Sequence, residues 1–165
     1  MAITVYGFPS GDCGYNLIDS PIMLYWQPSL EMVGRYVRWA FPHDGGRKLH
    51  ISASNETAEA TAQAVLPVLQ RLRAKHKVVY PLDAYRTLNR GEQAGKFITV
   101  YSGRMMEEYL TITRELEKVL GPLAQAGRIK AGPVPRDRQS GYTKAEQQLG
   151  GSGMISFVQL DSFSA

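Results

Sequence analysis

The chain has 165 residues, of which 44% are hydrophobic and 21% are charged, so we expect one domain with its own hydrophobic core. No apolar run approaches the roughly 20 residues of a membrane span, and one cysteine with three histidines excludes an internal disulfide and a cysteine-based zinc site. The net charge is +4, and because the first 45 residues hold two basic and four acidic side chains, the positive charge belongs to the rest of the chain.

Strands are predicted in the first third of the chain. Residues 48–53 alternate in polarity, which is typical of a half-buried strand. Leu49 and Ile51 lie on its apolar face, so Lys48 and His50 are expected to point together from the other face. Earlier strands are predicted at residues 3–8, 22–26 and 33–41.

Two long amphipathic helices follow. The first is predicted to start after Ser54, a good N-cap residue, and to end in the basic cluster of residues 71–75. Pro67 is expected to kink it. The second has an apolar stripe over residues 106–123 and is expected to end at Gly127.

Residues 127–153 hold six glycines and two prolines and are predicted to form a mobile loop, followed by a last strand at 154–160. Several strands with two long helices predict an α+β fold: a small, mostly antiparallel sheet with two long helices packed against it, in a single domain. Three shorter elements are predicted between the helices: a strand at 77–80, a helix at 84–89 capped by Asp83, and a strand at 96–101.

Basic and histidine side chains gather around the predicted strands, without an obvious carboxylate partner. This group comprises Lys48, His50, Lys77, Arg90, Lys96 and Tyr101. The sequence has no nucleophile elbow, no carboxylate pair at the strand ends and no phosphate-binding glycine motif. The interpretation that remains is a site that binds phosphate through cations, with a lysine as base and a histidine as acid.

Three segments carry a resemblance to a known family. GGRKLHISAS (45–54), HKVV (76–79) and NRGEQAGKFITVY (89–101) resemble the core motifs of bacterial phosphothreonine lyases. That family includes secreted effectors of the OspF and SpvC type and the lyase domains of lanthipeptide synthetases. The segments follow in the same order as in the synthetase domains, so residues 1–165 are interpreted as one lyase-like domain.

The resemblance implies β-elimination of phosphate from phosphoserine or phosphothreonine, with no metal or cofactor. Lys77 matches the base that removes the α-proton, and His50 matches the acid that protonates the departing phosphate. Lys48 and Arg90 match phosphate-binding residues, and Tyr101 matches a tyrosine of the site. The base must be a neutral amine, so the pKa of Lys77 is expected to fall through burial and nearby cations such as Lys96.

One departure from the family lies near the C-terminus. Relatives carry a second phosphate-binding arginine in or near the last strand, whereas residues 154–163 contain none. Arg136 and Arg138 are the candidates to replace it from the segment 127–153.

Three hypotheses follow. In the first, the protein is a cytoplasmic lyase for a ribosomal precursor peptide that a separate kinase has phosphorylated, alone or in complex with the lyase. In the second, it is an effector, exported by a dedicated system, that acts on phosphorylated host kinases. In the third, it is a non-catalytic subunit that binds a phosphopeptide or leader peptide. A membrane partner is not expected, and a nucleic acid is disfavoured.

Overall fold

The computed structural model describes residues 4–9, 15–17, 23–26, 47–102 and 106–159. Its centre is a seven-stranded sheet in the order β3-β4-β6-β7-β5-β9-β8, and every neighbouring pair is antiparallel. The strands are β3 (Tyr15–Leu17), β4 (Met23–Trp26), β5 (Arg47–Ile51), β6 (Lys75–Val79), β7 (Ile98–Tyr101), β8 (Gln147–Leu149) and β9 (Ile155–Gln159). A separate hairpin pairs β1 (Thr4–Val5) with β2 (Phe8–Pro9).

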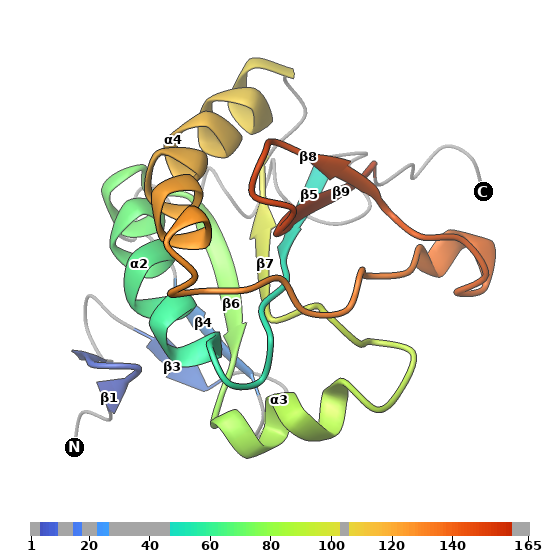
Figure 1. The fold of residues 1–165 in the computed structure, drawn as a ribbon, viewed down its shortest axis with the longest axis horizontal. Coiled ribbons are helices and arrows are strands. Elements are labelled where there is room, and N and C mark those ends of the chain that lie inside the picture. Colours follow the sequence, from blue (N-terminus) through green and yellow to red (C-terminus); the bar gives the residue numbers. More distant parts are fainter. Residues whose placement is uncertain (1–3, 10–14, 18–22, 27–46, 103–105, 160–165) are drawn as a thin grey trace.

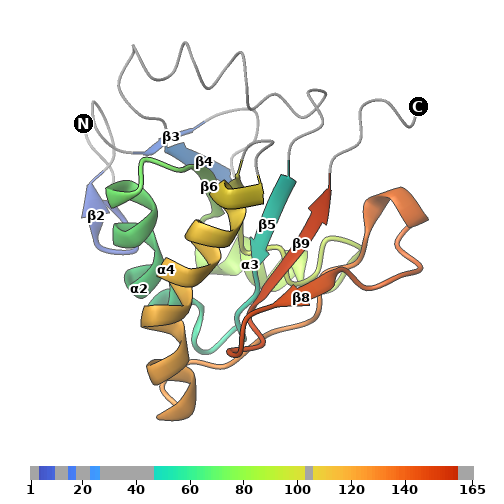
Figure 2. The same cartoon turned by 90° about the horizontal axis from the view of Figure 1, so that it is seen from above.

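Two long helices, α2 (Ala58–Arg71) and α4 (Met106–Gln125), pack side by side on one face of this sheet (Figures 1 and 2). The core lies between them and the sheet. It is built from buried aliphatic side chains such as Leu49 and Val100 of the sheet, Leu66 of α2 and Leu116 of α4, all fully buried. The predicted α+β fold, an antiparallel sheet with two long helices against it, is confirmed.

The helix boundaries differ in detail from the prediction. Ser54 Oγ accepts a 3.3 Å hydrogen bond from the Thr57 amide, so it stabilises the turn that leads into α2 rather than the first residue of the helix. The short helix α3 (Leu82–Leu88) has Pro81 as its N-cap residue, so the prediction of Asp83 as the cap was wrong. Proline suits a helix start because it has no amide hydrogen to leave unpaired.

Glycine and proline residues mark two points of the long helices. Gly127 follows α4 with φ +71°, a left-handed conformation that glycine adopts without strain, and this confirms the predicted end. Pro67 lies inside α2, and the kink expected there stays a prediction.

The segment 127–153 contains regular structure that was not predicted. It holds the 3-10 helix η2 (Arg138–Ser140), the bridge between Arg136 and Ala145, and β8. Two of the three β8 residues are exposed, so no alternation of polarity marked this strand in the sequence. Mobility of the segment stays a prediction, and the strand expected at 33–41 lies outside the described residues.

No helix in the described parts of the chain is long and apolar enough to span a membrane. The same residues contain no group of three or more His, Cys, Asp or Glu side chains that could hold a metal ion.

Candidate active site

Strand register brings Lys77 and His50 to the two sides of one residue. Thr99 of β7 pairs with Lys77 of β6 on one side and with His50 of β5 on the other. Paired residues of antiparallel strands project from the same face, and neighbouring strands are about 4.8 Å apart. Lys77 and His50 therefore lie two strand spacings apart on one face of the sheet.

A second row runs parallel to the first, two residues along each strand. Tyr101 of β7 pairs with Lys75 on one side and with Lys48 on the other. Lys75 Nζ lies 5.5 Å from the centroid of the Tyr101 ring. These rows occupy the sheet face opposite α2 and α4, because Leu49 and Ile51, which alternate with them in β5, are buried in the core.

His50 has a carboxylate partner that the sequence did not reveal. Its Nδ1 donates a 2.7 Å hydrogen bond to Glu146 Oε1, and Ser156 Oγ donates a 2.9 Å hydrogen bond to the same oxygen. Ser156 pairs with His50 across β9 and β5. With Nδ1 bound to the carboxylate, Nε2 is the nitrogen left to face a substrate. No carboxylate partner was obvious in the sequence, because Glu146 is distant from His50 along the chain and lies just before an unpredicted strand.

Burial and charge act in opposite directions on this pair. Burial lowers the pKa of His50, and the hydrogen bond and charge of Glu146 only partly offset this effect. Burial raises the pKa of Glu146, but the hydrogen bonds from His50 and Ser156 and the nearby positive charge of Lys96 outweigh it, so the pKa lies below its usual range. A neutral imidazole therefore donates to an ionised carboxylate.

The segment that carries Glu146 is anchored at both ends. Near its start, Ser52 Oγ donates a 2.6 Å hydrogen bond to the Pro133 carbonyl beside the end of β5. Beyond β8, Ser152 Oγ donates a 2.7 Å hydrogen bond to Glu117 Oε1 of α4. Glu146 is itself buried, with 6% of its surface exposed. These contacts place its carboxylate against His50.

Positive charges from three parts of the chain act on Lys48. Burial is the main cause that lowers the pKa of Lys48 to about 8, followed by the charges of Lys77 and Lys96, and Arg138 adds a smaller effect. Lys77, Lys96 and Arg138 each lie close enough to Lys48 for their charge to act on it. The arrangement favours an anion, which would relieve the repulsion.

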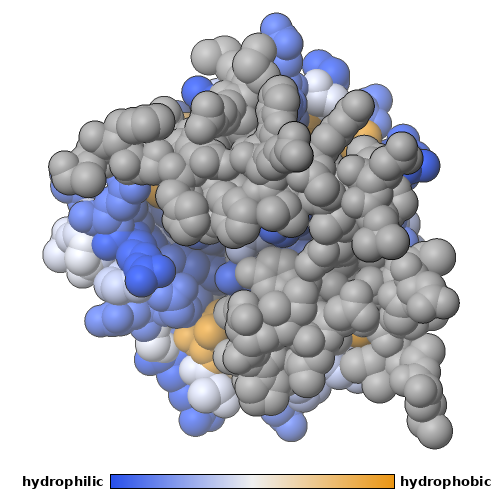
Figure 3. Space-filling model, turned by 180° about the vertical axis from the view of Figure 1, so that it is seen from behind, coloured by the Kyte–Doolittle hydropathy of each residue, from blue (hydrophilic) through white to orange (hydrophobic). Residues whose placement is uncertain are grey.

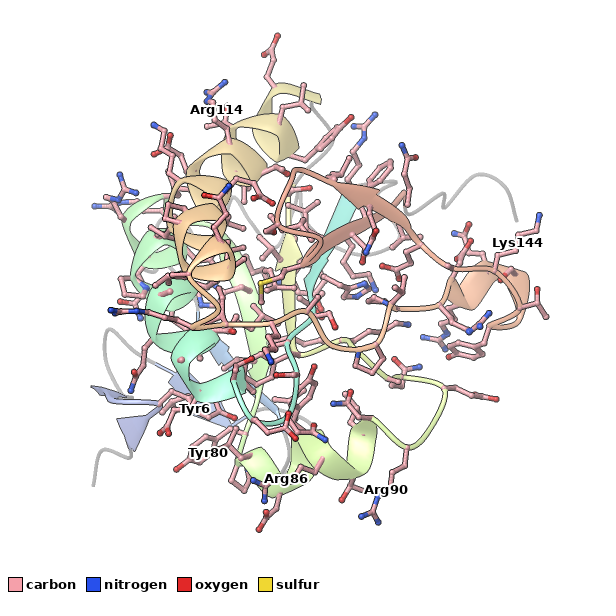
Figure 4. All side chains as sticks on the ribbon, in the orientation of Figure 1. Tyr6, Tyr80, Arg86, Arg90, Arg114 and Lys144 are labelled. Atoms are coloured by element: carbon pink, nitrogen blue, oxygen red, sulfur yellow. The ribbon has the colours of Figure 1, made fainter. Side chains whose placement is uncertain are left out.

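The structure does not bring every predicted residue to this cluster. Arg90 is exposed in the turn after α3, and its side chain points away from the sheet (Figure 4). Arg136 is also exposed, and its Nη1 donates a 3.1 Å hydrogen bond to the Thr143 carbonyl. Arg138 is exposed too, but it is the loop arginine whose charge acts on both Lys48 and Lys96. The residues that the structure groups are Lys48, His50, Lys77, Lys96, Tyr101, Arg138 and Glu146.

Seen from behind, the described surface is mainly hydrophilic (Figure 3). Such a surface suits a polar ligand better than an apolar one.

Comparison with protein families identifies the chain. The model of the RamC N-terminal domain matches residues 34–133. The chain belongs to this family. Among curated protein sequences, none matches it significantly.

Solved structures similar to this RamC N-terminal domain are phosphothreonine lyases. VirA of Chromobacterium violaceum is 18% identical with a TM-score of 0.58, and the match covers 92% of this chain and 69% of VirA. SpvC of Salmonella is 15% identical with a TM-score of 0.58, covering 96% of this chain and 67% of SpvC. The type III effector OspF of Shigella flexneri is 11% identical with a TM-score of 0.52, covering 96% and 72%. The phosphothreonine lyase fold expected from the three motifs is confirmed.

Proposed function

We propose that this protein is a phosphoserine and phosphothreonine lyase that eliminates phosphate from a phosphorylated peptide. The observation that carries the proposal is the placement of Lys77 and His50 on either side of Thr99. A base and an acid two strand spacings apart can act on the α-hydrogen and the phosphate oxygen of one residue between them. The likeness in fold to phosphothreonine lyases supports the same chemistry.

The base is the neutral amine of Lys77. It takes the α-proton, the electron pair of the C–H bond forms the Cα–Cβ double bond, and the Cβ–O bond to phosphate breaks. The products are inorganic phosphate and dehydroalanine or dehydrobutyrine in the peptide. No water enters the reaction, so elimination differs from hydrolysis in the mass of its product.

His50 is the acid that protonates the departing phosphate through Nε2. Its imidazole must be charged for this step, whereas burial favours the neutral form. A phosphate dianion beside Nε2 favours the imidazolium, and the Glu146 carboxylate on Nδ1 stabilises the same form. Substrate binding therefore prepares the acid for its role.

Lys48, Lys96 and Arg138 bind the phosphate and neutralise the charge that develops on it. Lys48 lies close enough to Lys77 for their positive charges to repel. This repulsion favours loss of a proton from the pair, which suits a site that needs one neutral amine and several cations. Tyr101 lies next to Lys48 in the second row and, with 8% of its surface exposed, forms part of the wall of the site.

The favoured substrate is a ribosomal precursor peptide phosphorylated by a separate kinase, with which the lyase could form a complex. Membership of the RamC N-terminal domain family and the resemblance to lanthipeptide synthetase lyase domains support this context. The similarity in fold to OspF, described as a type III effector, favours a second candidate, a secreted lyase that acts on a phosphorylated host protein.

Mass spectrometry of phosphoserine and phosphothreonine peptides incubated with the purified protein tests the proposal. Elimination removes about 98 Da, the mass of H₃PO₄, whereas hydrolysis restores the hydroxyl group. We expect this loss with the wild-type protein, and its absence with Lys77→Ala and His50→Ala. Lys118→Ala is the control, because Lys118 is exposed on α4 and pairs with Glu115. Phosphopeptide binding without any mass loss would refute the lyase and favour a binding subunit.

A further inference from the structure

The ammonium group of Lys96 is held in the site by an aromatic ring. Lys96 precedes β7, and only 9% of its surface is exposed. Its Nζ lies 5.3 Å from the centroid of the Tyr142 ring, within the range of a cation–π interaction. In the described parts of the chain this ammonium forms no hydrogen bond or ion pair. Burying a charge that forms no ion pair is costly, so the group is suited to an anion that arrives from solution.

Tyr142 is itself fixed at both ends. Its Oη accepts a 2.7 Å hydrogen bond from Gln93 Nε2, in the turn that leads to Lys96. Its amide donates a 3.0 Å hydrogen bond to the Asp137 carbonyl, and its φ of +64° is a left-handed conformation that a bulky side chain rarely adopts. Backbone strain of this kind persists where the surrounding contacts enforce it.

The acidic groups near Lys96 are engaged elsewhere. Glu146 and Asp137 raise the pKa of Lys96 through their charges, although burial lowers it overall. The Glu146 carboxylate accepts hydrogen bonds from His50 and Ser156, and Asp137 Oδ1 accepts one from the Gln139 amide. The positive charge of Lys96 is therefore available to a ligand.

We propose that Tyr142 is a positioning residue that holds the Lys96 ammonium ready to bind the substrate phosphate. The inference rests on the proposed lyase function, because the phosphate site is the one assigned there. A lysine side chain has many rotamers, and holding it in advance removes an entropic cost that the substrate would otherwise meet on binding. The ring does so without neutralising the charge, which a carboxylate in the same position would do.

The test compares Tyr142→Phe, Tyr142→Leu, Lys96→Met and the double variant Lys96→Met/Tyr142→Leu. Phenylalanine keeps the ring and loses the hydrogen bond from Gln93, whereas leucine loses both. Lys144→Met is the control, because Lys144 is exposed at the outer end of the same segment (Figure 4). The measurements are KM and kcat for phosphopeptide elimination, the Kd for inorganic phosphate, and the melting temperature.

We expect Tyr142→Leu to raise KM and the Kd for phosphate about 3- to 10-fold while kcat changes less than about twofold. Tyr142→Phe should retain most of the wild-type affinity. In the Lys96→Met background the leucine substitution should have no further effect on phosphate affinity, because Tyr142 acts through Lys96. A purely structural role would lower the melting temperature and weaken phosphate binding equally in both backgrounds.

Equal effects in both backgrounds, or an unchanged Kd in Tyr142→Leu, would overturn the inference. The Kd for inorganic phosphate is measured without catalysis. The lyase function and the positioning role of Tyr142 can therefore fail separately. If the wild-type protein eliminates nothing but Tyr142→Leu weakens phosphate binding only when Lys96 is present, the lyase function fails and the positioning role stands. If elimination is observed and the phosphate affinity of Tyr142→Leu is unchanged, the lyase function stands and the positioning role fails.

Discussion

His50 Nδ1 and Glu146 Oε1 are 2.7 Å apart, although 96 positions separate the two residues in the sequence. The contact fixes which imidazole nitrogen faces the substrate and supplies a negative charge to stabilise the imidazolium. The proposed acid therefore depends on a residue from a different part of the chain.

Replacing Glu146 by Gln should lower kcat about 10- to 100-fold with a small change in KM, because the acid loses the charge that stabilises its protonated form. The pH at which kcat declines on the alkaline side should also move down. Steady-state kinetics from pH 6 to 9 check both effects. Glu92→Gln, an exposed substitution away from His50, is the control and should match the wild-type protein.

Phosphate affinity should decline as the pH rises through about 8. The pKa of Lys48 is lowered to about 8, and only its charged form attracts phosphate, so its contribution is complete well below that pH and lost above it. Bound phosphate raises this pKa, which moves the midpoint upward. Calorimetric titration with inorganic phosphate from pH 7 to 10 measures the decline. In Lys48→Met the affinity should be lower at the start of this range, approach the wild-type value at its alkaline end and depend less on pH, and an identical pH profile in the two proteins would contradict the prediction.

Arg138→Met should raise KM for the phosphopeptide about 10-fold, the effect expected from losing one charge-assisted hydrogen bond. Arg90→Met and Arg136→Met are matched arginine substitutions outside the cluster, and we expect KM within about twofold of the wild-type value. The three variants are compared with one phosphopeptide at one ionic strength. A larger effect at Arg90 than at Arg138 would reverse this assignment.

Acid should destabilise the protein through His76, which is fully buried on β6 and is not part of the site. Burial lowers its pKa to about 4, below the value of about 6.5 in an unfolded chain. Between these values the unfolded state binds a proton that the folded state does not, so the free energy of unfolding falls as the pH falls. The full effect is about 3 kcal/mol.

Urea denaturation of the wild-type protein and His76→Asn at pH 7.5 and pH 4.5 isolates this contribution. Asparagine keeps a donor for the Ala74 carbonyl, which accepts a 2.8 Å hydrogen bond from His76 Nδ1, but does not titrate. The loss of stability between the two pH values should be smaller in the variant. Equal losses would show that other groups cause the acid sensitivity.

Gly95→Ala should destabilise the protein by about 2 kcal/mol or more and lower kcat/KM as well. Gly95 has φ +82°, and a Cβ atom there would collide with the Pro133 carbonyl in the segment that carries Arg138 and Glu146. Gly121→Ala is the control, because no atom lies within 4 Å of its Cβ position inside α4 and alanine favours a helix. Thermal unfolding and kinetics of both variants test the expected contrast.

Local patterns in the sequence determined most of the secondary structure. Alternating polarity in β5 predicted that Lys48 and His50 share a face, and helical spacing predicted α2 and α4. These signals exist because each element buries one side against the core. Apolar residues therefore recur along the sequence with the period of the helix or the strand. The three motifs in order also indicated the phosphothreonine lyase fold, and the resemblance named Lys77 and His50 as the candidate base and acid.

Only the tertiary structure decided which distant groups complete the site. Glu146 and Arg138 come from a segment rich in glycine and polar residues, which buries too few side chains in the core to leave a periodic pattern. Strand register placed Thr99 between Lys77 and His50, and the turn after α3 directed Arg90 away from them. Pairing between strands and the docking of loops depend on contacts across the whole chain, so no local stretch of sequence could specify them.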